Sequence, residues 1–481
     1  MQLDHIMQQS AAAFSQYKET SLAQRATFLR HLAELLDQGV ERLLPIACAE
    51  SHLPEGRIKG ELARTTGQIR LFATYLEEGS WLEVTIDHGD PDRSPAPKPD
   101  LRRMLVPLGP VIVFGASNFP LAFSTAGGDS ISALAAGCTV VYKGHPAHPE
   151  TSLLVFELVQ AALKEQDLPA AIFQHVAGGI AEGQELVQHP LAEAVAFTGS
   201  YTGGKALFDL AYARPKPIPV YAEMGSTNPI VALEEYCEAN MEKMASDYSQ
   251  SLTLGAGQFC TNPGLLFIPE SKADDFAALA AKLLAAMPSQ LMLHPGIQSA
   301  YASAVEAMKA QAGLEWICTP DHLTAALPAL ARVKMEDWSA SHRLHEEVFG
   351  PFGLMVTYAD REQLHAMPAL LQGQLTITLW AEEQELAAHE GLIAGLGSRC
   401  GRLLFGGVPT GVEVGHAMQH GGPFPATTDS RSTSVGVHAI KRFARPLAYQ
   451  NCPDSLLPEA LKEKNPLKIS RTVDGKLSLG D

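Results

Sequence analysis

The chain has 481 residues and a formal net charge of −17, with 46% hydrophobic and 19% charged residues. A chain of this length can form two or three domains with a large core. Its acidic balance argues against nucleic acid and against anionic membrane surfaces as partners. Any anionic substrate must therefore be bound by local donors, because the overall field does not attract it.

The N-terminal twenty residues lack a basic segment followed by an apolar one, so we expect no signal peptide. The seven cysteines include no C-x-x-C pair, and their odd number does not suggest a disulfide framework. Together these features predict a cytoplasmic protein.

Residues 1–80 carry apolar side chains three and four positions apart, which predicts helices. Residues 87–103 are rich in Pro and Asp and predict an extended crossing segment or a domain boundary. From "PVIVFGA" to "IPVYAEMG", short apolar strands alternate with helices. This alternation predicts an α/β fold with a doubly wound parallel sheet, whose ligands bind at the carboxyl ends of the strands.

A second α/β region is expected from about residue 225, with a helix over "KADDFAALAAKLLAAM" and strands over "GLMVTYAD" and "GQLTITLWA". Beyond residue 436 the pattern predicts a helix over "VHAIKRFARP" and then a polar tail.

One stretch of the first region, "AVAFTGSYTGGKAL", raises the question of phosphate binding. From Gly199 it has the spacing G-x-x-x-x-G-K, between a predicted strand and a predicted helix. A P-loop also needs Ser or Thr after the Lys, because that hydroxyl binds Mg²⁺, and here Ala206 follows. We therefore reject an ATP site, which leaves a dinucleotide or no phosphate ligand.

Three residues are candidates for catalysis. Cys260 lies in the glycine-rich "GAGQFCTNPG" and is either an accessible nucleophile or a small buried side chain. Asn118 follows a predicted strand in "FGASNFP", where its amide can face a cleft or bond its own backbone in a turn. Glu223 ends the strand of "YAEMGS" and is either a general base or a carboxylate that faces water.

Two further residues could contact a cofactor. Lys143 ends the strand "TVVYK" and either meets a phosphate or extends along the sheet edge into water. Glu347 in "HEEVFGP" either holds a ribose or caps a turn.

The histidine pairs in "GHPAHPE" and "GHAMQH" are interrupted by Pro or Gly, so no helical metal pair is expected, and we predict no metal site.

In chain order, the motifs "SNFP", "VVYKGHP", "FTGSYTGG", "EMGS", "GQFCTNP" and "EEVFGP" resemble those of the aldehyde dehydrogenase superfamily. The segments "HGGPFPATTDSRSTSVG" and "RPLAYQNCP" are similar to those of its α-ketoglutaric semialdehyde (2,5-dioxovalerate) dehydrogenase subfamily. NADP-linked fatty aldehyde dehydrogenases share much of this pattern, so a medium- or long-chain aldehyde is the alternative substrate. The presence of Glu223 argues against a CoA-acylating relative, which has little use for a base that activates water.

The resemblance implies a role for each matching residue. Cys260 is the nucleophile that forms a thiohemiacetal and then a thioester, Asn118 helps to hold the oxyanion, and Glu223 activates the hydrolytic water. The cofactor-binding residues are those that match the family's dinucleotide segments: Lys143, His145, Gly199, Ser200, Gly204, Glu347 and Phe349.

The cofactor predicted from this resemblance is NADP, with NAD as the weaker alternative. Family members that prefer NAD commonly carry Glu three residues after the Lys of this strand, where this chain has Pro146. An acidic side chain binds the 2′-OH of NAD, whereas a cation accommodates the 2′-phosphate of NADP. Lys143 remains, and His145 is a second donor nearby.

The resemblance also implies a domain plan. Residues 1–86 and 108–224 form the dinucleotide-binding domain, residues 225–436 the catalytic domain, and residues 87–107 and 437–481 a small element that bridges the subunits of a homodimer or homotetramer. Arg102, Arg103 and Arg343 are candidate anchors for a substrate carboxylate, although surface arginines are commoner.

Overall fold

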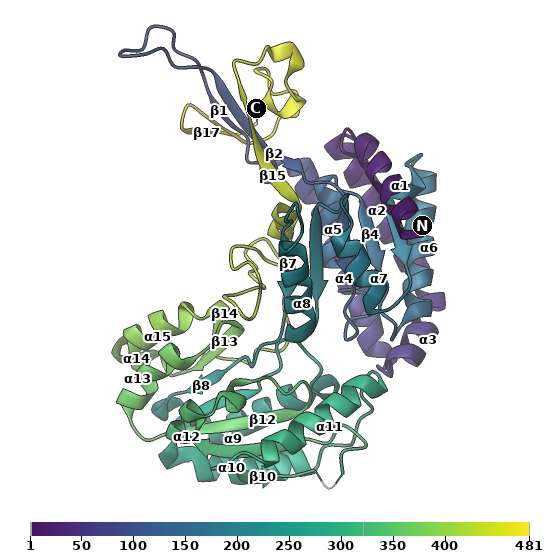
Figure 1. Ribbon diagram of the computed structural model, residues 1–481. Coiled ribbons are helices and arrows are strands. Elements are labelled where there is room, and N and C mark those ends of the chain that lie inside the picture. The colour runs from purple at the N-terminus through teal and green to yellow at the C-terminus, as the bar shows by residue number, and fades with distance from the viewer. Residues whose placement is uncertain (1, 321, 481) are drawn as a thin grey trace.

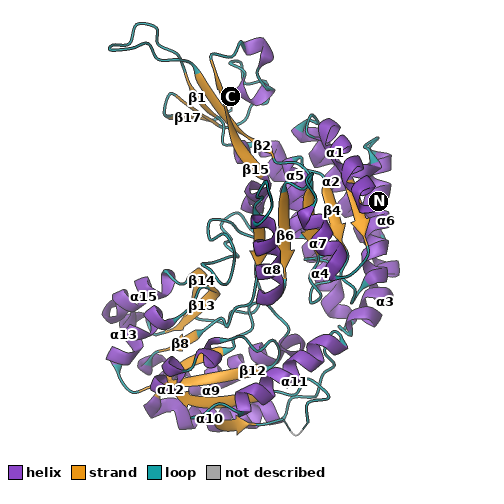
Figure 2. Ribbon diagram, in the orientation of Figure 1, coloured by secondary structure: helices purple, strands orange, loops and turns teal. Residues whose placement is uncertain are grey.

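The structure is a computed structural model that describes residues 2–320 and 322–480. It contains three sheets, two of them covered by helices and one that projects as an arm (Figures 1 and 2). No helix in the described part of the chain has both the length and the apolar character that a membrane span requires.

The first sheet is parallel throughout and has the strand order β5-β4-β3-β6-β7. Its strands are β3 (Val111–Phe114), β4 (Val140–Lys143), β5 (Phe173–Val176), β6 (Ala194–Thr198) and β7 (Val220–Glu223). Its helices are α1 (Gln2–Tyr17), α2 (Leu22–Gln38), α3 (Val40–Ser51), α4 (Glu55–Glu78), α5 (Gly128–Ala136), α6 (Pro149–Glu165), α7 (Ile180–Gln188) and α8 (Tyr201–Tyr212).

Alternate side chains of these strands pack on opposite faces of the sheet. Val113 and Tyr142 belong to the core formed with α2, α4, α5 and α6. Ile112 and Val141 belong to a second core formed with α1, α7 and α8. Burial on both faces explains why β3, β4 and β6 are predominantly apolar, and the predicted doubly wound sheet is confirmed.

The second sheet has the order β10-β11-β12-β9-β8-β13-β14 and is parallel except between β10 and β11. Its strands are β8 (Ile230–Ala232), β9 (Leu265–Pro269), β10 (Glu315–Cys318), β11 (Ala329–Lys334), β12 (Phe352–Tyr358), β13 (Gln374–Trp380) and β14 (Cys400–Phe405). The helices around it are α9 (Glu234–Thr253), α10 (Glu270–Ala285), α11 (Pro295–Lys309), α12 (Met335–Ala340), α13 (Arg361–Leu370), α14 (Glu383–Leu386) and α15 (Glu390–Gly397).

The third sheet, which we call the arm, has the order β15-β2-β1-β16-β17. Its strands are β1 (Thr85–Asp87), β2 (Leu101–Pro107), β15 (Ala444–Gln450), β16 (Arg471–Val473) and β17 (Lys476–Ser478). It joins the segment after α4 to the end of the described chain and extends away from the two larger sheets (Figure 1).

Two predictions for the end of the chain are wrong. The segment predicted as one helix forms a 3-10 helix over Val437–Phe443 and then strand β15, which pairs with β2 along its whole length. The predicted polar tail contains β16 and β17. These strands depend on partners far away in the sequence, which local periodicity does not reveal.

Helix α5 begins at Gly128, after a turn that follows β3. The preceding turn is fixed from outside, because the buried carboxylate of Glu61 accepts hydrogen bonds from the backbone N–H groups of Leu121 and Ala122 at 2.8 and 2.9 Å. This turn carries Asn118 and the side chains after it.

Candidate active site

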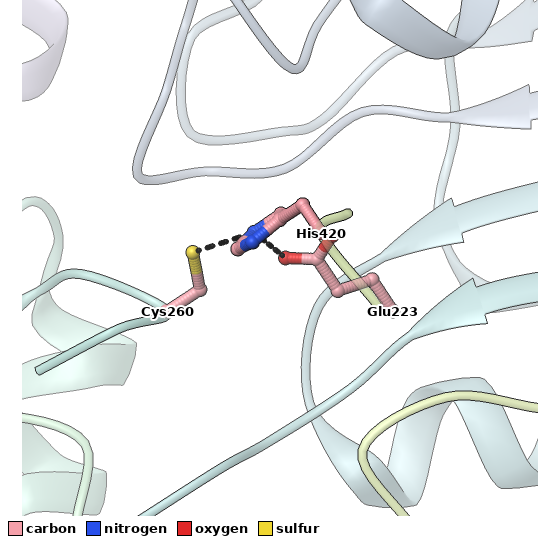
Figure 3. A group of neighbouring side chains, drawn as sticks. All are labelled: Glu223, Cys260 and His420. Atoms are coloured by element: carbon pink, nitrogen blue, oxygen red, sulfur yellow. Dashed lines mark hydrogen bonds and ion pairs between the residues drawn. The ribbon is translucent and has the colours of Figure 1, made fainter. Parts of the chain in front are cut away.

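Three side chains from distant parts of the sequence meet at one point (Figure 3). The Nε2 atom of His420 lies 3.0 Å from Oε1 of Glu223 and 3.5 Å from Sγ of Cys260. Glu223 is the last residue of β7, Cys260 lies before β9, and His420 lies in the long loop after β14. The site therefore joins the first sheet to the second, and the C-terminal loop closes it.

The loop that presents Cys260 is held from behind. The side-chain amide of Asn228 donates to the backbone carbonyls of Cys260 and Asn262, each at 2.9 Å. The backbone N–H of Asn228 in turn donates to Oε1 of Gln374 at 3.1 Å. At Gly257 the backbone has φ +67° and passes so close to Gly350 that a Cβ atom would lie 2.3 Å from its carbonyl carbon. Only glycine fits there.

Asn118 reaches the same loop from the other side. Its amide nitrogen donates to the backbone carbonyl of Gln258 at 3.1 Å, two residues before the thiol. The second hydrogen of that nitrogen has no partner among the described residues, so it can donate to an oxyanion. The structure thus brings Asn118, Cys260 and Glu223 together at the carboxyl edge of the first sheet.

Electrostatics favour a thiol on Cys260 and a carboxylate on Glu223. Burial raises the pKa of Cys260 well above its ordinary value, and the negative charge of Glu223 adds to the effect, while Arg64 opposes it. Burial also acts to raise the pKa of Glu223, but the attraction of His420 and hydrogen bonds from His420, Ser434 and Cys260 hold it below its ordinary value. The Oγ atom of Ser434 donates directly to Oε2 of Glu223. The protonated thiol of Cys260 therefore lies next to the carboxylate of Glu223, which can act as a base.

Nδ1 of His420 is buried and has no partner within the described residues. We therefore assign the imidazole proton to Nε2, which donates it to Glu223. The donor atoms of Glu223, Cys260 and His420 all lie within 4.8 Å of one another, which is close enough to hold a metal ion. Their mutual hydrogen bonds instead suit proton transfer, and the absence of a metal stays a prediction.

The segment after β6 forms the start of α8. Gly199 and Ser200 are exposed at the helix N-terminus, where Oγ of Ser200 accepts from the N–H of Gly203 at 3.2 Å. Gly204 is buried, and a Cβ atom there would lie 2.7 Å from the Met224 side chain, so the helix packs closely on the sheet. An exposed helix N-terminus with free N–H groups suits a pyrophosphate.

A second feature that suits a dinucleotide is the side chain of Lys143. It ends β4, is 7% exposed, and has no hydrogen-bond or ion-pair partner in the described chain. Desolvation lowers its pKa. A buried ammonium without a partner is unfavourable, so a ligand oxygen would satisfy it. Lys143 and the start of α8 thus fit a dinucleotide.

His145 follows Lys143 and stacks on His148, with ring centroids 5.5 Å apart. Burial, with the neighbouring His148, His294 and Lys143, lowers its pKa to about 3, so the ring is neutral at pH 7. Its Nδ1 accepts from the N–H of Ala147 at 3.1 Å, which leaves an N–H at Nε2 to donate.

Glu347 and Phe349 line a pocket of about 360 Å³ of empty space, part of it open to solvent, beside the Cys260 loop. Gly225 lets the Glu347 carboxylate approach the backbone, because a Cβ there would lie 2.3 Å from Oε2. Burial raises the pKa of Glu347 to about 8. A half-buried carboxyl group in a pocket suits ribose hydroxyls.

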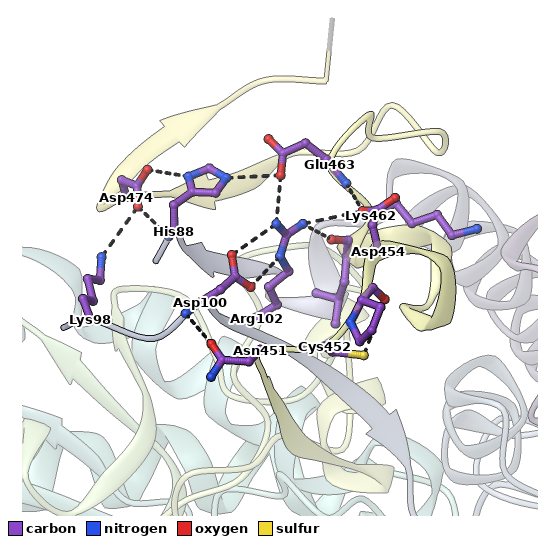
Figure 4. A network of polar contacts seen from close by, with 12 residues as sticks. His88, Lys98, Asp100, Arg102, Asn451, Cys452, Asp454, Lys462, Glu463 and Asp474 are labelled. Carbon is purple, nitrogen blue, oxygen red and sulfur yellow. Dashed lines mark hydrogen bonds and ion pairs between the residues drawn. The ribbon is translucent and has the colours of Figure 1, made fainter. Parts of the chain in front are cut away.

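The three arginines considered as carboxylate anchors lie elsewhere. Arg102 is in the arm, where its guanidinium contacts Asp100 at 3.0 Å and Glu463 at 2.9 Å (Figure 4). Arg103 pairs with Glu83 at 3.6 Å, and Arg343 pairs with its neighbour Glu346. None of them is free to anchor a substrate at Cys260.

The family model that matches residues 1–389 is described as the aldehyde dehydrogenase family. The chain belongs to this family. It is 44% identical to an α-ketoglutaric semialdehyde dehydrogenase of Acinetobacter baylyi, over 99% of this chain and 91% of that protein. It is 46% identical to α-ketoglutaric semialdehyde dehydrogenase 2 of Azospirillum brasilense, over 96% and 89% of the two chains.

The fold is shared with solved structures. One is the glyceraldehyde-3-phosphate dehydrogenase GapN of Methanocaldococcus jannaschii, solved in complex with NADP, with a TM-score of 0.77 and 17% identity. The match covers 93% of each chain. The predicted family and fold are thereby confirmed, and the chain is an aldehyde dehydrogenase.

Sequence reasoning missed two residues of this site. His420 was considered only as half of a metal pair with His416, and that search passed over a lone histidine in a Gly- and Pro-rich loop. Asn228 in "GSTNP" has φ +46°, a conformation that the sequence does not reveal, and no local pattern predicts its hydrogen bonds to the Cys260 loop.

Proposed function

We propose that this dehydrogenase oxidises α-ketoglutaric semialdehyde to 2-oxoglutarate, with NADP preferred over NAD. The observation that carries the chemistry is the meeting of Cys260, His420 and Glu223, a nucleophile in contact with a proton acceptor. The substrate follows from two relatives named for it, at 44% and 46% identity over nearly the whole chain.

In the first half of the reaction, Cys260 gives up its proton and attacks the aldehyde carbon. Glu223 accepts that proton from the thiol and releases it to solvent before the second half, while the Nε2–H of His420 holds its carboxylate in place. Asn118 and the backbone N–H of Cys260 donate to the oxygen as it becomes negative. A bound nicotinamide dinucleotide would supply the hydride acceptor, and the acyl group would stay on Cys260 as a thioester.

In the second half, Glu223 takes a proton from the water that attacks the thioester. Ser434 and His420 hold the two oxygens of its carboxylate, so the base is oriented before the water arrives. The same Glu223–His420 pair then returns a proton to the sulfur as the acid leaves.

The cofactor would lie across the carboxyl edge of the first sheet. We assign its pyrophosphate to Gly199, Ser200 and Gly204 at the start of α8, and its nicotinamide ribose and ring to Glu347 and Phe349. Lys143 and the Nε2–H of His145 would face the 2′-phosphate, and Pro146 puts no carboxylate there to repel it.

The domain plan follows from the same assignment. Residues 1–86 and 108–224 would bind the cofactor, residues 225–436 would carry the nucleophile, and the arm, residues 87–107 and 437–481, would bridge the subunits of a cytoplasmic homodimer or homotetramer. The arm supports this plan because its short strands extend beyond both larger sheets (Figure 1).

A steady-state panel tests the substrate. Purified enzyme is assayed with α-ketoglutaric semialdehyde, succinic semialdehyde and decanal, each with NADP and with NAD, and Cys260→Ala serves as the inactive control. We expect the highest kcat/KM for α-ketoglutaric semialdehyde with NADP. A value for decanal tenfold above that for the semialdehyde would replace this proposal with the fatty aldehyde alternative.

A further inference from the structure

A cluster of three aromatic rings adjoins the nucleophile. Phe119 follows Asn118 and packs against Phe123 and Phe259, with ring centroids 5.3 and 5.6 Å away. Phe259 immediately precedes Cys260. The rings thus form an apolar wall, two of whose residues are chain neighbours of Asn118 and Cys260.

Two arginines of α4 lie over this wall. Arg57 and Arg64 are seven residues apart, two turns of helix, so they share one face of α4 with Glu61 between them. The guanidinium carbon of Arg57 lies 4.5 Å from the centroid of Phe119 and 5.4 Å from that of Phe259. That of Arg64 lies 5.2 Å from the centroid of Phe123.

The two arginines differ in what balances their charge. Arg57 forms an ion pair of 2.7 Å with Glu61, the same buried carboxylate whose other oxygen fixes the turn at Leu121 and Ala122. Arg57 therefore belongs to the support of that turn.

Arg64 is half-buried, and in the described chain it has neither a hydrogen-bond nor an ion-pair partner. Its charge nevertheless acts on the nearest anionic groups of the site. It is one of the influences that lower the pKa of Cys260. A half-buried guanidinium with unused donors, beside an aromatic wall that leads to the thiol, suits a carboxylate.

We propose that Arg64 determines specificity by binding the carboxylate of the aldehyde substrate while Phe119, Phe123 and Phe259 line the path of its carbon chain. This inference rests on the proposed substrate, whose carboxylate lies at the opposite end of a five-carbon chain from the aldehyde. It also explains how a chain with a net charge of −17 selects an anion, because the attraction is local.

The test compares charged and neutral aldehydes in Arg64→Gln and Arg64→Lys. The measured quantity is the ratio of kcat/KM for succinic semialdehyde to that for butanal, because this ratio cancels any change in thiol reactivity. A charge-assisted hydrogen bond contributes about 1.5–3 kcal/mol, so we expect the ratio to fall roughly ten- to a hundredfold in Arg64→Gln. Arg64→Lys should keep part of it.

Arg70→Gln is the matched control, since Arg70 is on the same helix but pairs at 2.5 Å with Asp37 on the surface. Its ratio should equal that of the wild type. An unchanged ratio in Arg64→Gln overturns the proposal. If that variant has no measurable turnover, binding of glutarate is measured by calorimetry. The dissociation constant should then rise at least tenfold, and an unchanged value overturns the proposal equally.

The outcome for Arg64 is separable from the outcome for the substrate. If the wild type prefers decanal to α-ketoglutaric semialdehyde, the proposed function fails, whatever the variants do. If the semialdehyde is preferred and the Arg64→Gln ratio is unchanged, the function stands and the role of Arg64 fails.

Discussion

Lys205 points along its own helix to Asp209, with its ammonium 2.7 Å from both oxygens of that carboxylate. The two residues are four apart on α8, the spacing of a common surface ion pair. The lysine that completes the apparent P-loop spacing is therefore committed to the helix surface. Any phosphate near α8 must be met by backbone N–H groups and by another cation.

The cation that we predict to contact the 2′-phosphate of NADP is Lys143. Lys143→Ala removes a buried ammonium, so we expect the dissociation constant for NADP to rise about ten- to a hundredfold and that for NAD to change much less. Lys205→Ala is the matched control and should leave both constants unchanged. Fluorescence titration of each variant gives the values. Equal losses for both cofactors would show that Lys143 does not contact the 2′ position.

Glu223→Gln should separate the two halves of the reaction. Hydride transfer can also start from a thiolate whose proton has been lost to solvent, whereas thioester hydrolysis needs the base, so rapid mixing should show a burst of reduced cofactor and then turnover slowed by about 10²–10⁴. Ser434→Ala should slow the second phase less, because it only loosens one oxygen of the same carboxylate. If the burst of reduced cofactor falls in parallel with the turnover rate, a base other than Glu223 activates the hydrolytic water.

The pH dependence of thiol alkylation tests the charge balance at Cys260. Burial and the negative charge of Glu223 raise the pKa of this thiol, so the midpoint for reaction with iodoacetamide in the free enzyme should lie on the alkaline side of an ordinary cysteine. Glu223→Gln removes a negative charge and should lower the midpoint. Arg64→Gln removes a positive charge and should raise it. Midpoints that do not move in opposite directions would contradict this account.

His88 links the arm to pH. Hydrogen bonds to Asp474 and then Glu463 raise its pKa (Figure 4), while Lys98 and Arg102 contact those two carboxylates. A raised pKa in the folded state gives stability that is complete below the unfolded value, near 6.5, and is lost as pH rises through the folded value. The side chains are partly exposed, so the effect is small.

We therefore expect the exchange protection of the Thr472 amide, which donates to Val84 at 2.9 Å, to fall severalfold as pH rises above about 6.5. Hydrogen exchange with mass spectrometry, corrected for intrinsic rates, measures it. His88→Gln should abolish the pH dependence. Protection that rises with pH in the native chain would refute the role of His88.

The parts of the fold that the sequence predicts are those with local causes. The strands from Val111 to Glu223 pack on both faces of their sheet, and β4, β6 and β7 end at the polar residues Lys143, Thr198 and Glu223. The arm strands are three to seven residues long and partly or fully exposed, so their pairing, not their composition, makes them strands.

The same division applies to the site. The three predicted catalytic residues lie beside glycines or at strand ends, and sequence patterns make such positions easy to recognise: Cys260, Glu223 and Asn118. His420 becomes significant only through contact with residues 160 and 197 positions away. In the sequence, Arg64 resembles any surface charge of a long helix, and only the structure shows that it has no hydrogen-bond or ion-pair partner among the described residues. The local sequence shows neither which side chains lie close together in the fold nor which charged side chains lie apart from any partner.

The pairing of β1 with β16 has a consequence for synthesis of the chain. Thr85 lies opposite Thr472, so the hairpin of β1 and β2 leaves the ribosome long before the strands that cover its two sides. Unpaired edge strands readily join strands of other chains. During translation the open hairpin is exposed to neighbouring nascent chains of the same polysome. Any product that stops before residue 444 keeps both edges bare and becomes a substrate for chaperones or for aggregation.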